Sequence, residues 1–289
     1  MTGRELATKI PFLYAPPHVL EIKMNTGKLV RLNRLFSHAS GRLCSVAVDH
    51  FIGYGEGLPA GLRRIGSTLA AVVAARPDAV TMHKGIAAAA WGPHAGRVPM
   101  ILQSSTARPD DTACEQVATP EEAVRLGADA FAVAAFIRGL TEAAHLRAVA
   151  DCVRDASRFE MPVICHVYPR DREKKISLAP DDIAWAVRCA CEVGVDVVKV
   201  PYCGDVKAYA QIVAECPVPV VAAGGPKAGT LADALGMMAE VVESGARGAT
   251  IGRNIWGFEE ITKAVHAFKW VIHEKKSPAE ALRLAGLSS

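Results

Sequence analysis

Residues 181–202 read DDIAWAVRCACEVGVDVVKVPY, and this stretch defines the unit from which the chain is built. Apolar residues in 181–193 recur at the three- and four-residue spacing of an amphipathic helix. Gly194 follows, as glycine often does at the C-terminus of a helix. Residues 195–202 are then almost continuously apolar, which is typical of a strand covered on both faces in a parallel sheet. The stretch therefore predicts a helix, a tight turn and a buried parallel strand.

The same alternation extends along most of the chain. Eight strand-like runs are separated by helix-like segments, and such a series predicts a closed α/β barrel, the (β/α)8 or TIM barrel. An open doubly wound sheet is disfavoured, because no glycine-rich phosphate loop follows the first strand. The predicted strands are residues 43–50, 79–85, 99–105, 130–136, 162–168, 195–202, 218–225 and 249–255. The predicted helices include residues 141–159, 181–193, 230–244 and 258–274.

The sequence predicts two parts, an N-terminal arm and the barrel that follows it. Residues 1–40 predict an extended, proline-containing arm that becomes a short helix near residues 29–36, packed on the barrel or on a neighbouring subunit. Residues 41–289 predict the barrel as one domain. The weakest unit is residues 86–97, where an Ala- and Gly-rich segment predicts only a short helix.

The composition excludes several classes of protein. A hydrophobic content of 51% over 289 residues supports a large core. A net charge of +3 without a Lys/Arg run argues against nucleic acid as a partner. No apolar run of about 18 residues and no signal-peptide pattern is found, so we expect a cytoplasmic protein that does not bind membranes. The eight cysteines lack paired metal spacing, and we expect them to be reduced.

Lys199 is the most informative single residue, because it interrupts the apolar strand 195–202. A buried ammonium loses hydration, which lowers its pKa and favours the free amine. A free amine at neutral pH can attack a carbonyl and form a Schiff base. The alternative is a lysine that extends from the strand end to solvent.

Other polar residues end the predicted strands, where the chemistry of such barrels gathers. Tyr168 is a candidate for proton transfer or, alternatively, a core tyrosine. Asp49 either holds a substrate hydroxyl and assists proton transfer, or is a structural partner of a lysine. Lys84 either neutralises developing charge near Lys199 or forms a surface ion pair. The remaining strand-end candidates are His50, His83, Gln103 and His166.

The last two strands predict a phosphate site. Gly224 and Gly225 end the seventh strand, and Gly252 with Arg253 ends the eighth. Glycines let the backbone approach an anion, and arginine adds a charge-assisted donor. Phosphate sites in these barrels are often built after strands seven and eight. The alternative is a pair of tight turns with a solvated arginine.

A metal-dependent mechanism is the rival to the lysine. His50, His83 and His166 lie at strand ends and are conceivable zinc ligands. No two of them have a close ligand spacing, and an amine nucleophile makes a metal unnecessary. The sequence therefore predicts neither a metal nor another cofactor.

Short motifs in order along the chain match a known family. They are GKLVRL (27–32), VDH (48–50), HKGI (83–86), YPR (168–170), VKV (198–200), YCGD (202–205), AGGPK (223–227) and GRNIW (252–256). With these motifs the chain resembles the archaeal-type class I fructose-bisphosphate aldolases, a family that includes synthases making aminodideoxyheptulosonate. The similarity runs from about residue 27 almost to the C-terminus.

The resemblance implies a Schiff-base aldolase acting on a phosphorylated ketose. Lys199 would be the nucleophile, Tyr168 the acid–base group and Asp49 a hydroxyl-binding or proton-relay residue. Phosphate would bind at the glycine loops and Arg253. The resemblance also implies a homo-oligomer built from rings, often a decamer.

The chain also departs from the pattern of these aldolases. His166 stands where they have tryptophan, and residues 51–56 are bulkier than the expected glycine-rich loop. These changes preserve the lysine chemistry and leave the aldehyde half of the substrate open. We therefore expect an aldolase, with two alternatives. One is a transferase of the transaldolase, synthase or thiolase kind, and the other is a barrel that senses or scaffolds a sugar phosphate without catalysis.

Overall fold

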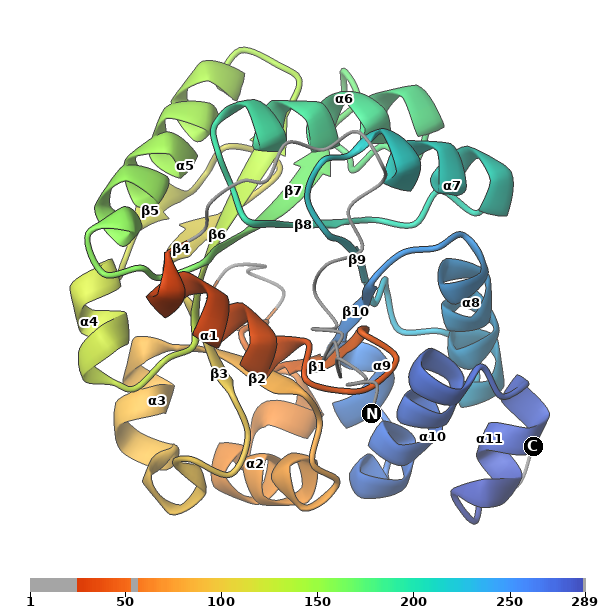
Figure 1. Cartoon of the computed structure of the whole chain (residues 1–289). Coiled ribbons are helices and arrows are strands. Elements are labelled where there is room, and N and C mark those ends of the chain that lie inside the picture. The colour runs from red at the N-terminus through yellow and green to blue at the C-terminus, as the bar shows by residue number, and fades with distance from the viewer. Residues whose placement is uncertain (1–24, 53–56, 288–289) are drawn as a thin grey trace, which may run out of the picture.

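A computed structural model describes residues 25–52 and 57–287 of the chain. Within these ranges, eight parallel strands close into a barrel with helices around it, as predicted (Figure 1). In spatial order the strands are β1 (Leu43–Ala47), β10 (Gly248–Ile251), β9 (Val220–Ala223), β8 (Val197–Val200), β7 (Val163–Pro169), β6 (Ala130–Ile137), β3 (Met100–Gln103) and β2 (Ala79–His83).

The strands are mostly shorter than predicted at their C-terminal ends. Residues 48–50 leave the sheet after β1, and Lys84 begins helix α3 (Lys84–Ala90) instead of continuing β2. The prediction of strand through residue 255 was wrong, because Arg253–Trp256 forms the short helix α9. In each case pairing with the neighbouring strands ends earlier than the sequence pattern predicted. The released residues form the loops at the C-terminal end of the barrel.

The outer helices follow the strands in chain order. The unit after β2 has only the seven-residue α3 and a 3-10 turn, in line with the short helix predicted there. Helix α4 (Pro120–Arg125) begins with a capping box, in which Thr119 and Glu122 each satisfy a backbone N–H of the other. The remaining helices of the ring are α2 (Ile65–Ala74), α5 (Glu142–Ser157), α6 (Pro180–Glu192), α7 (Val206–Glu215), α8 (Leu231–Glu243), α10 (Ile261–Glu274) and α11 (Pro278–Leu284).

Helix α1 (Thr26–Leu35) closes the N-terminal end of the barrel, across which it lies in Figure 1. Leu32, Leu35 and Phe36 are almost fully buried in one cluster with the first inward residues of the strands, such as Val197 and Ile164. The short helix predicted near residues 29–36 therefore packs on the barrel of its own chain. The predicted extended arm lies outside the described residues.

A two-stranded hairpin that the sequence did not predict follows β3. Strand β4 (Ser105–Ala107) pairs antiparallel with β5 (Cys114–Gln116), so Ser105 belongs to this hairpin and not to the barrel. The buried Arg170, at the end of β7, donates to Pro109 O at 2.7 Å and to Asp111 Oδ1 at 2.6 Å. These bonds hold the hairpin beside the C-terminal ends of β6 and β7.

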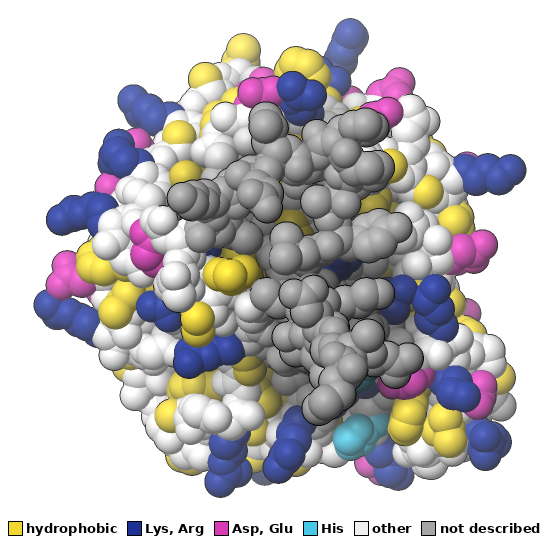
Figure 2. Space-filling view, viewed as in Figure 1, with side chains coloured by type: hydrophobic (Ala, Val, Ile, Leu, Met, Phe, Trp, Pro, Cys, Tyr) yellow, Lys and Arg dark blue, Asp and Glu magenta, His cyan; other side chains and the backbone are white. Residues whose placement is uncertain are grey.

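The surface at the α1 end carries charges of both signs. Figure 2 shows Lys and Arg side chains spaced around its margin with Asp and Glu between them, consistent with the small net charge of +3. None of the helices in the described part of the chain is long and apolar enough to cross a membrane.

Candidate active site

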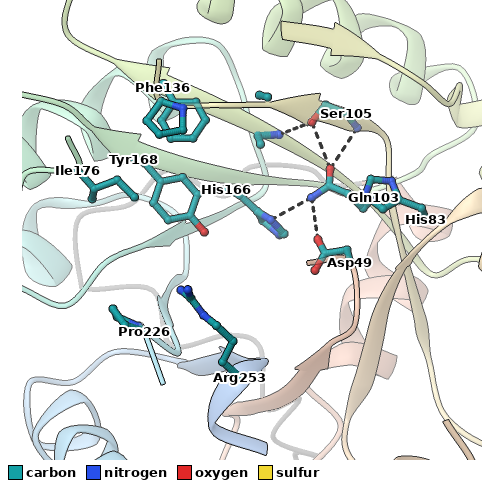
Figure 3. Close-up of a pocket in the computed structure, with 13 residues that line it drawn as sticks. Asp49, His83, Gln103, Ser105, Phe136, His166, Tyr168, Ile176, Pro226 and Arg253 are labelled. Atoms are coloured by element: carbon teal, nitrogen blue, oxygen red, sulfur yellow. Dashed lines mark hydrogen bonds between the residues drawn. The ribbon is translucent and has the colours of Figure 1, made fainter. Parts of the chain in front are cut away.

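A cavity of about 260 Å³ lies at the C-terminal ends of the strands (Figure 3). Six of the predicted strand-end residues line it, namely Asp49, His83, Gln103, His166, Tyr168 and Arg253. They come from the ends of β1, β2, β3, β7 and β10, which lie far apart in the sequence. The barrel therefore brings together at one end the residues that the strand-end pattern had selected.

Lys199 lies on the inner face of β8, beside this cavity. It is paired in register with His166 of β7, and Val197, two residues before it, belongs to the interior cluster under α1. Since side chains alternate along a strand, Lys199 also points inward. Its exposed fraction is only 3%, so it does not extend to solvent. It is not in the cavity wall itself, but His166 beside it is.

The surroundings of Lys199 favour the neutral amine. Burial lowers the pKa of Lys199, the charge of Arg253 lowers it further, and Asp49 only partly opposes these effects. A lowered pKa increases the share of neutral amine, which is the form that attacks a carbonyl.

Asp49 is a buried carboxylate that stays charged. It accepts a hydrogen bond from Gln103 Nε2 at 3.1 Å and lies 3.4 Å from His50 Nδ1. Burial raises the pKa of Asp49, but the hydrogen bond and charge of His50 and the charge of Lys199 outweigh it and hold that pKa well below its usual value. His50 is thus a neighbour of Asp49 and not part of the cavity wall.

His166 and Gln103 form the floor of the cavity together with Asp49. Gln103 Nε2 lies 3.2 Å from His166 Nδ1, and Figure 3 shows Gln103 between the two side chains. Burial and the nearby Lys199 charge hold the pKa of His166 well below its usual value, so its imidazole is neutral. The sequence marked Gln103 only as a strand-end residue, because nothing in a lone glutamine indicates which side chains it will join.

Tyr168 closes one side of the cavity. Its ring stacks on Phe136 of β6 at 5.6 Å between centroids, and its hydroxyl points into the cavity in Figure 3. Its exposed fraction is 8%, and its ring belongs to a small apolar cluster with Ala107, Phe136 and Ala223. The ring of Tyr168 therefore packs like that of a core tyrosine, while its hydroxyl faces the site, as proton transfer requires.

The glycine loops after β9 and β10 lie against each other. The sequence predicted that their glycines leave room for an anion, but two of them leave room for other residues of the protein. Gly225 has a positive φ of +71°, which suits glycine. A Cβ on Gly224 would meet Ile251 Cα at 2.8 Å, and one on Gly252 would collide with the His50 ring. These two glycines therefore make room for the protein's own residues. Arg253 Nη2 lies 3.4 Å from Gly225 O, and the arginine lines the cavity.

Asn254, within the motif at residues 252–256, links the loops after β9 and β10. Its side-chain Nδ2 donates to Gly224 O at 2.8 Å and to Pro226 O at 2.9 Å, and its Oδ1 accepts from Ala228 N at 2.8 Å. Because Asn254 follows Arg253, these bonds fix the arginine against the loop after β9.

The prediction that Lys84 faces the site was wrong. Lys84 binds Glu122 at 2.7 Å, and its side chain is 43% exposed. The reason is that β2 ends at His83, which lines the cavity, whereas Lys84 is the first residue of helix α3. His83 and His166 both line the cavity, but no three His, Cys, Asp or Glu side chains within the described ranges are placed to share a metal ion.

Comparisons with known proteins identify the family of the chain. The family model described as DeoC/LacD family aldolase matches residues 43–257. A 2-amino-3,7-dideoxy-D-threo-hept-6-ulosonate synthase of Halobacterium salinarum is 33% identical over 266 residues, 91% of this chain and 98% of that protein. The class 1 fructose-bisphosphate aldolase of Thermoproteus tenax is 33% identical over 211 residues, 72% of this chain and 79% of the relative.

One solved structure with a similar fold contains a covalent reaction intermediate. It is an archaeal fructose-1,6-bisphosphate aldolase whose catalytic lysine is covalently bound to the carbinolamine intermediate of the substrate. The TM-score is 0.76 at 29% identity, over 85% of this chain and 99% of that one.

Proposed function

Because the chain belongs to the DeoC/LacD family of class I, Schiff-base aldolases, we propose that it cleaves or forms a carbon–carbon bond in a phosphorylated ketose. The supporting observation is the buried Lys199, whose pKa is lowered and whose neighbours Asp49 and Arg253 line the cavity. The amine of Lys199 adds to the ketone to give a carbinolamine, and loss of water gives an iminium. The iminium accepts the electron pair of the breaking bond, and an aldehyde leaves.

Tyr168 and Asp49 manage the protons in this proposal. The Tyr168 hydroxyl faces the cavity and gives its proton to the carbinolamine hydroxyl, which leaves as water. The resulting phenolate takes the proton of the substrate hydroxyl as the carbon–carbon bond breaks, and it returns that proton to the enamine carbon. Asp49 is held as a carboxylate and stabilises the iminium charge while it accepts a hydrogen bond from a substrate hydroxyl. Hydrolysis of the iminium then frees the ketone and restores Lys199.

Arg253 binds the substrate phosphate. It is the one arginine or lysine that lines the cavity within the described ranges, and the Asn254 bonds fix its position. In Figure 3 the Arg253 side chain extends towards the cavity, where it can hold the phosphate. Binding energy from this remote group holds the ketone against Lys199.

A synthase on the same site is the second candidate. The Halobacterium salinarum synthase is 33% identical over 91% of this chain. In a synthase, the enamine on Lys199 is passed to a second acceptor in place of a proton. Assays with and without an added aldehyde or keto acceptor separate the two activities, because only the synthase depends on the acceptor for turnover. The homo-oligomer implied by the resemblance stays a prediction.

Replacing Arg253 with alanine is expected to weaken phosphorylated substrates selectively. The loss should be about 1.5–3 kcal/mol in kcat/KM, the range for a charged hydrogen bond, while a non-phosphorylated analogue changes little. Steady-state kinetics with a matched pair of substrates measures the difference. Arg188→Ala, which breaks an exposed pair with Glu192 on α6, is the control. An equal loss for both substrates would make Arg253 a structural residue.

Treatment with a strong chelator is expected to leave activity unchanged. The iminium on Lys199 stabilises the carbanion, which is the task of the metal in a metal-dependent aldolase. The measurement is turnover after dialysis against the chelator, with and without added zinc. Loss of activity that zinc restores would instead indicate a site involving His83 and His166.

A further inference from the structure

The orientation of the Gln103 amide is fixed by its neighbours. Gln103 Oε1 accepts from Ser105 N at 3.2 Å, and a backbone N–H can only donate. The Ser105 hydroxyl accepts from Ala134 N at 2.8 Å, so its own hydrogen is free to donate to the same Oε1 at 3.2 Å. At the other end of the amide lies the Asp49 carboxylate, which can only accept. The NH2 group therefore faces Asp49 and His166.

This orientation determines where His166 carries its proton. The two hydrogens of Gln103 Nε2 are used by Asp49 Oδ2 at 3.1 Å and His166 Nδ1 at 3.2 Å. A donor facing Nδ1 requires a lone pair there, so the ring proton lies on Nε2. No hydrogen bond from the described residues occupies Nε2, and His166 lines the cavity.

We propose that Gln103 is a positioning residue that locks His166 in the neutral Nε2–H form, so that His166 donates a hydrogen bond to a substrate oxygen beside Lys199. The identity of that oxygen rests on the proposed function. Register places His166 directly next to Lys199, so the donor reaches the oxygen on the carbon adjacent to the iminium, or the carbinolamine oxygen that precedes it. His166 therefore does not act as a base, because its accessible nitrogen has no lone pair.

The burial of these side chains favours a single hydrogen-bond arrangement and so a single tautomer of His166. Gln103 and His166 are each only 4% exposed, and Ser105 is 7% exposed. In such surroundings an unpaired donor or acceptor is costly, so the alternating sequence of donors and acceptors from Ala134 to His166 stabilises one arrangement. A charged imidazolium at His166 would also lie beside Lys199, and the repulsion adds to the burial that holds the pKa of His166 down.

Solid-state NMR of the full chain labelled with ¹⁵N-histidine tests the tautomer directly, with His166→Phe to assign the signal. The expected spectrum shows an unprotonated Nδ1 and a protonated Nε2, unchanged between pH 6 and 9. A protonated Nδ1, or a ring that titrates in this range, overturns the proposal. In Gln103→Glu, the carboxylate facing Nδ1 is expected to move the proton to that nitrogen, and failure to do so also counts against the lock.

Kinetics tests the consequence. Gln103→Met can neither donate nor accept, and kcat is expected to fall by about 10²-fold, the value of a positioned donor at a developing oxyanion, with a smaller change in KM. Gln116→Met, on β5 outside the cavity wall, is the matched control. Borohydride trapping at Lys199 is measured in parallel. Trapping without the expected tautomer refutes the lock alone, whereas absence of trapping refutes the proposed function and leaves the NMR result intact. A Gln103→Met variant with wild-type kcat contradicts the proposal.

Discussion

Lys199→Met is expected to abolish turnover and all covalent capture of the substrate. In the wild type, borohydride reduction in the presence of a ketose phosphate should add the reduced mass of the ketone to the peptide that contains Lys199. Methionine has similar length but no amine, so neither the carbinolamine nor the iminium can form. Peptide mass spectrometry of the trapped protein and a turnover assay make the two measurements.

Lys84→Met is the matched control for this experiment. Lys84 is a lysine of the same barrel end, but it binds Glu122 on the outside and does not line the cavity. Its replacement should leave both labelling and turnover close to those of the wild type. Labelling at Lys84 in the wild type would overturn the assignment of the nucleophile.

The same substitution at Lys199 is expected to stabilise the fold at neutral pH. The folded protein lowers the pKa of Lys199, so the unfolded chain binds more protons than the folded one between that lowered value and the ordinary pKa of 10.5. The contribution of Lys199 to stability therefore rises with pH through this window, and below it the buried amine costs stability. Thermal unfolding should show a higher Tm for Lys199→Met at neutral pH, with the difference shrinking at alkaline pH. A lower Tm for the variant at neutral pH would contradict the desolvation of Lys199.

The sequence predicted the barrel because its periodicity depends on local rules. Each strand must be apolar on both faces and each helix on one, so the alternation is visible without knowledge of contacts. Lys199 was predicted for the same reason, since a charge within an apolar strand is conspicuous. His166 and Tyr168 are two positions apart on one strand, so alternation places them on the same face, and both line the cavity.

The sequence could not predict features that depend on contacts between residues far apart along the chain. His83 and Lys84 are adjacent in one predicted strand, but the pairing of β2 with β3 ends at His83, and Lys84 begins helix α3. The β4–β5 hairpin is held by Arg170 across 59 positions to Asp111, a contact without a local signature. Gln103 gains its role from Asp49 and His166, which are 54 and 63 positions away. Gly252 was assigned to an anion, but its missing side chain makes room for His50.

Tyr168→Phe is expected to separate Schiff-base formation from proton transfer. The phenylalanine ring can keep the stacking on Phe136, so the wall of the cavity and the approach to Lys199 should be preserved. Only the hydroxyl that points into the cavity is lost. Borohydride should therefore still trap the ketone on Lys199, more slowly because Tyr168 no longer protonates the carbinolamine hydroxyl, while turnover falls by roughly 10²–10⁴-fold, the usual contribution of a positioned acid–base group.

Two further measurements decide the role of the Tyr168 hydroxyl. Tyr202→Phe removes a hydroxyl from a tyrosine that does not line the cavity, and it should keep wild-type turnover. Exchange of the ketone's α-proton with deuterated water should slow in Tyr168→Phe by about the same factor as turnover, because the same group returns the proton to the enamine carbon. If Tyr168→Phe turns over at the wild-type rate, the residue only packs against Phe136. Proton transfer would then fall to Asp49, since His166 in its Nε2–H form has no lone pair towards the substrate and cannot accept the proton.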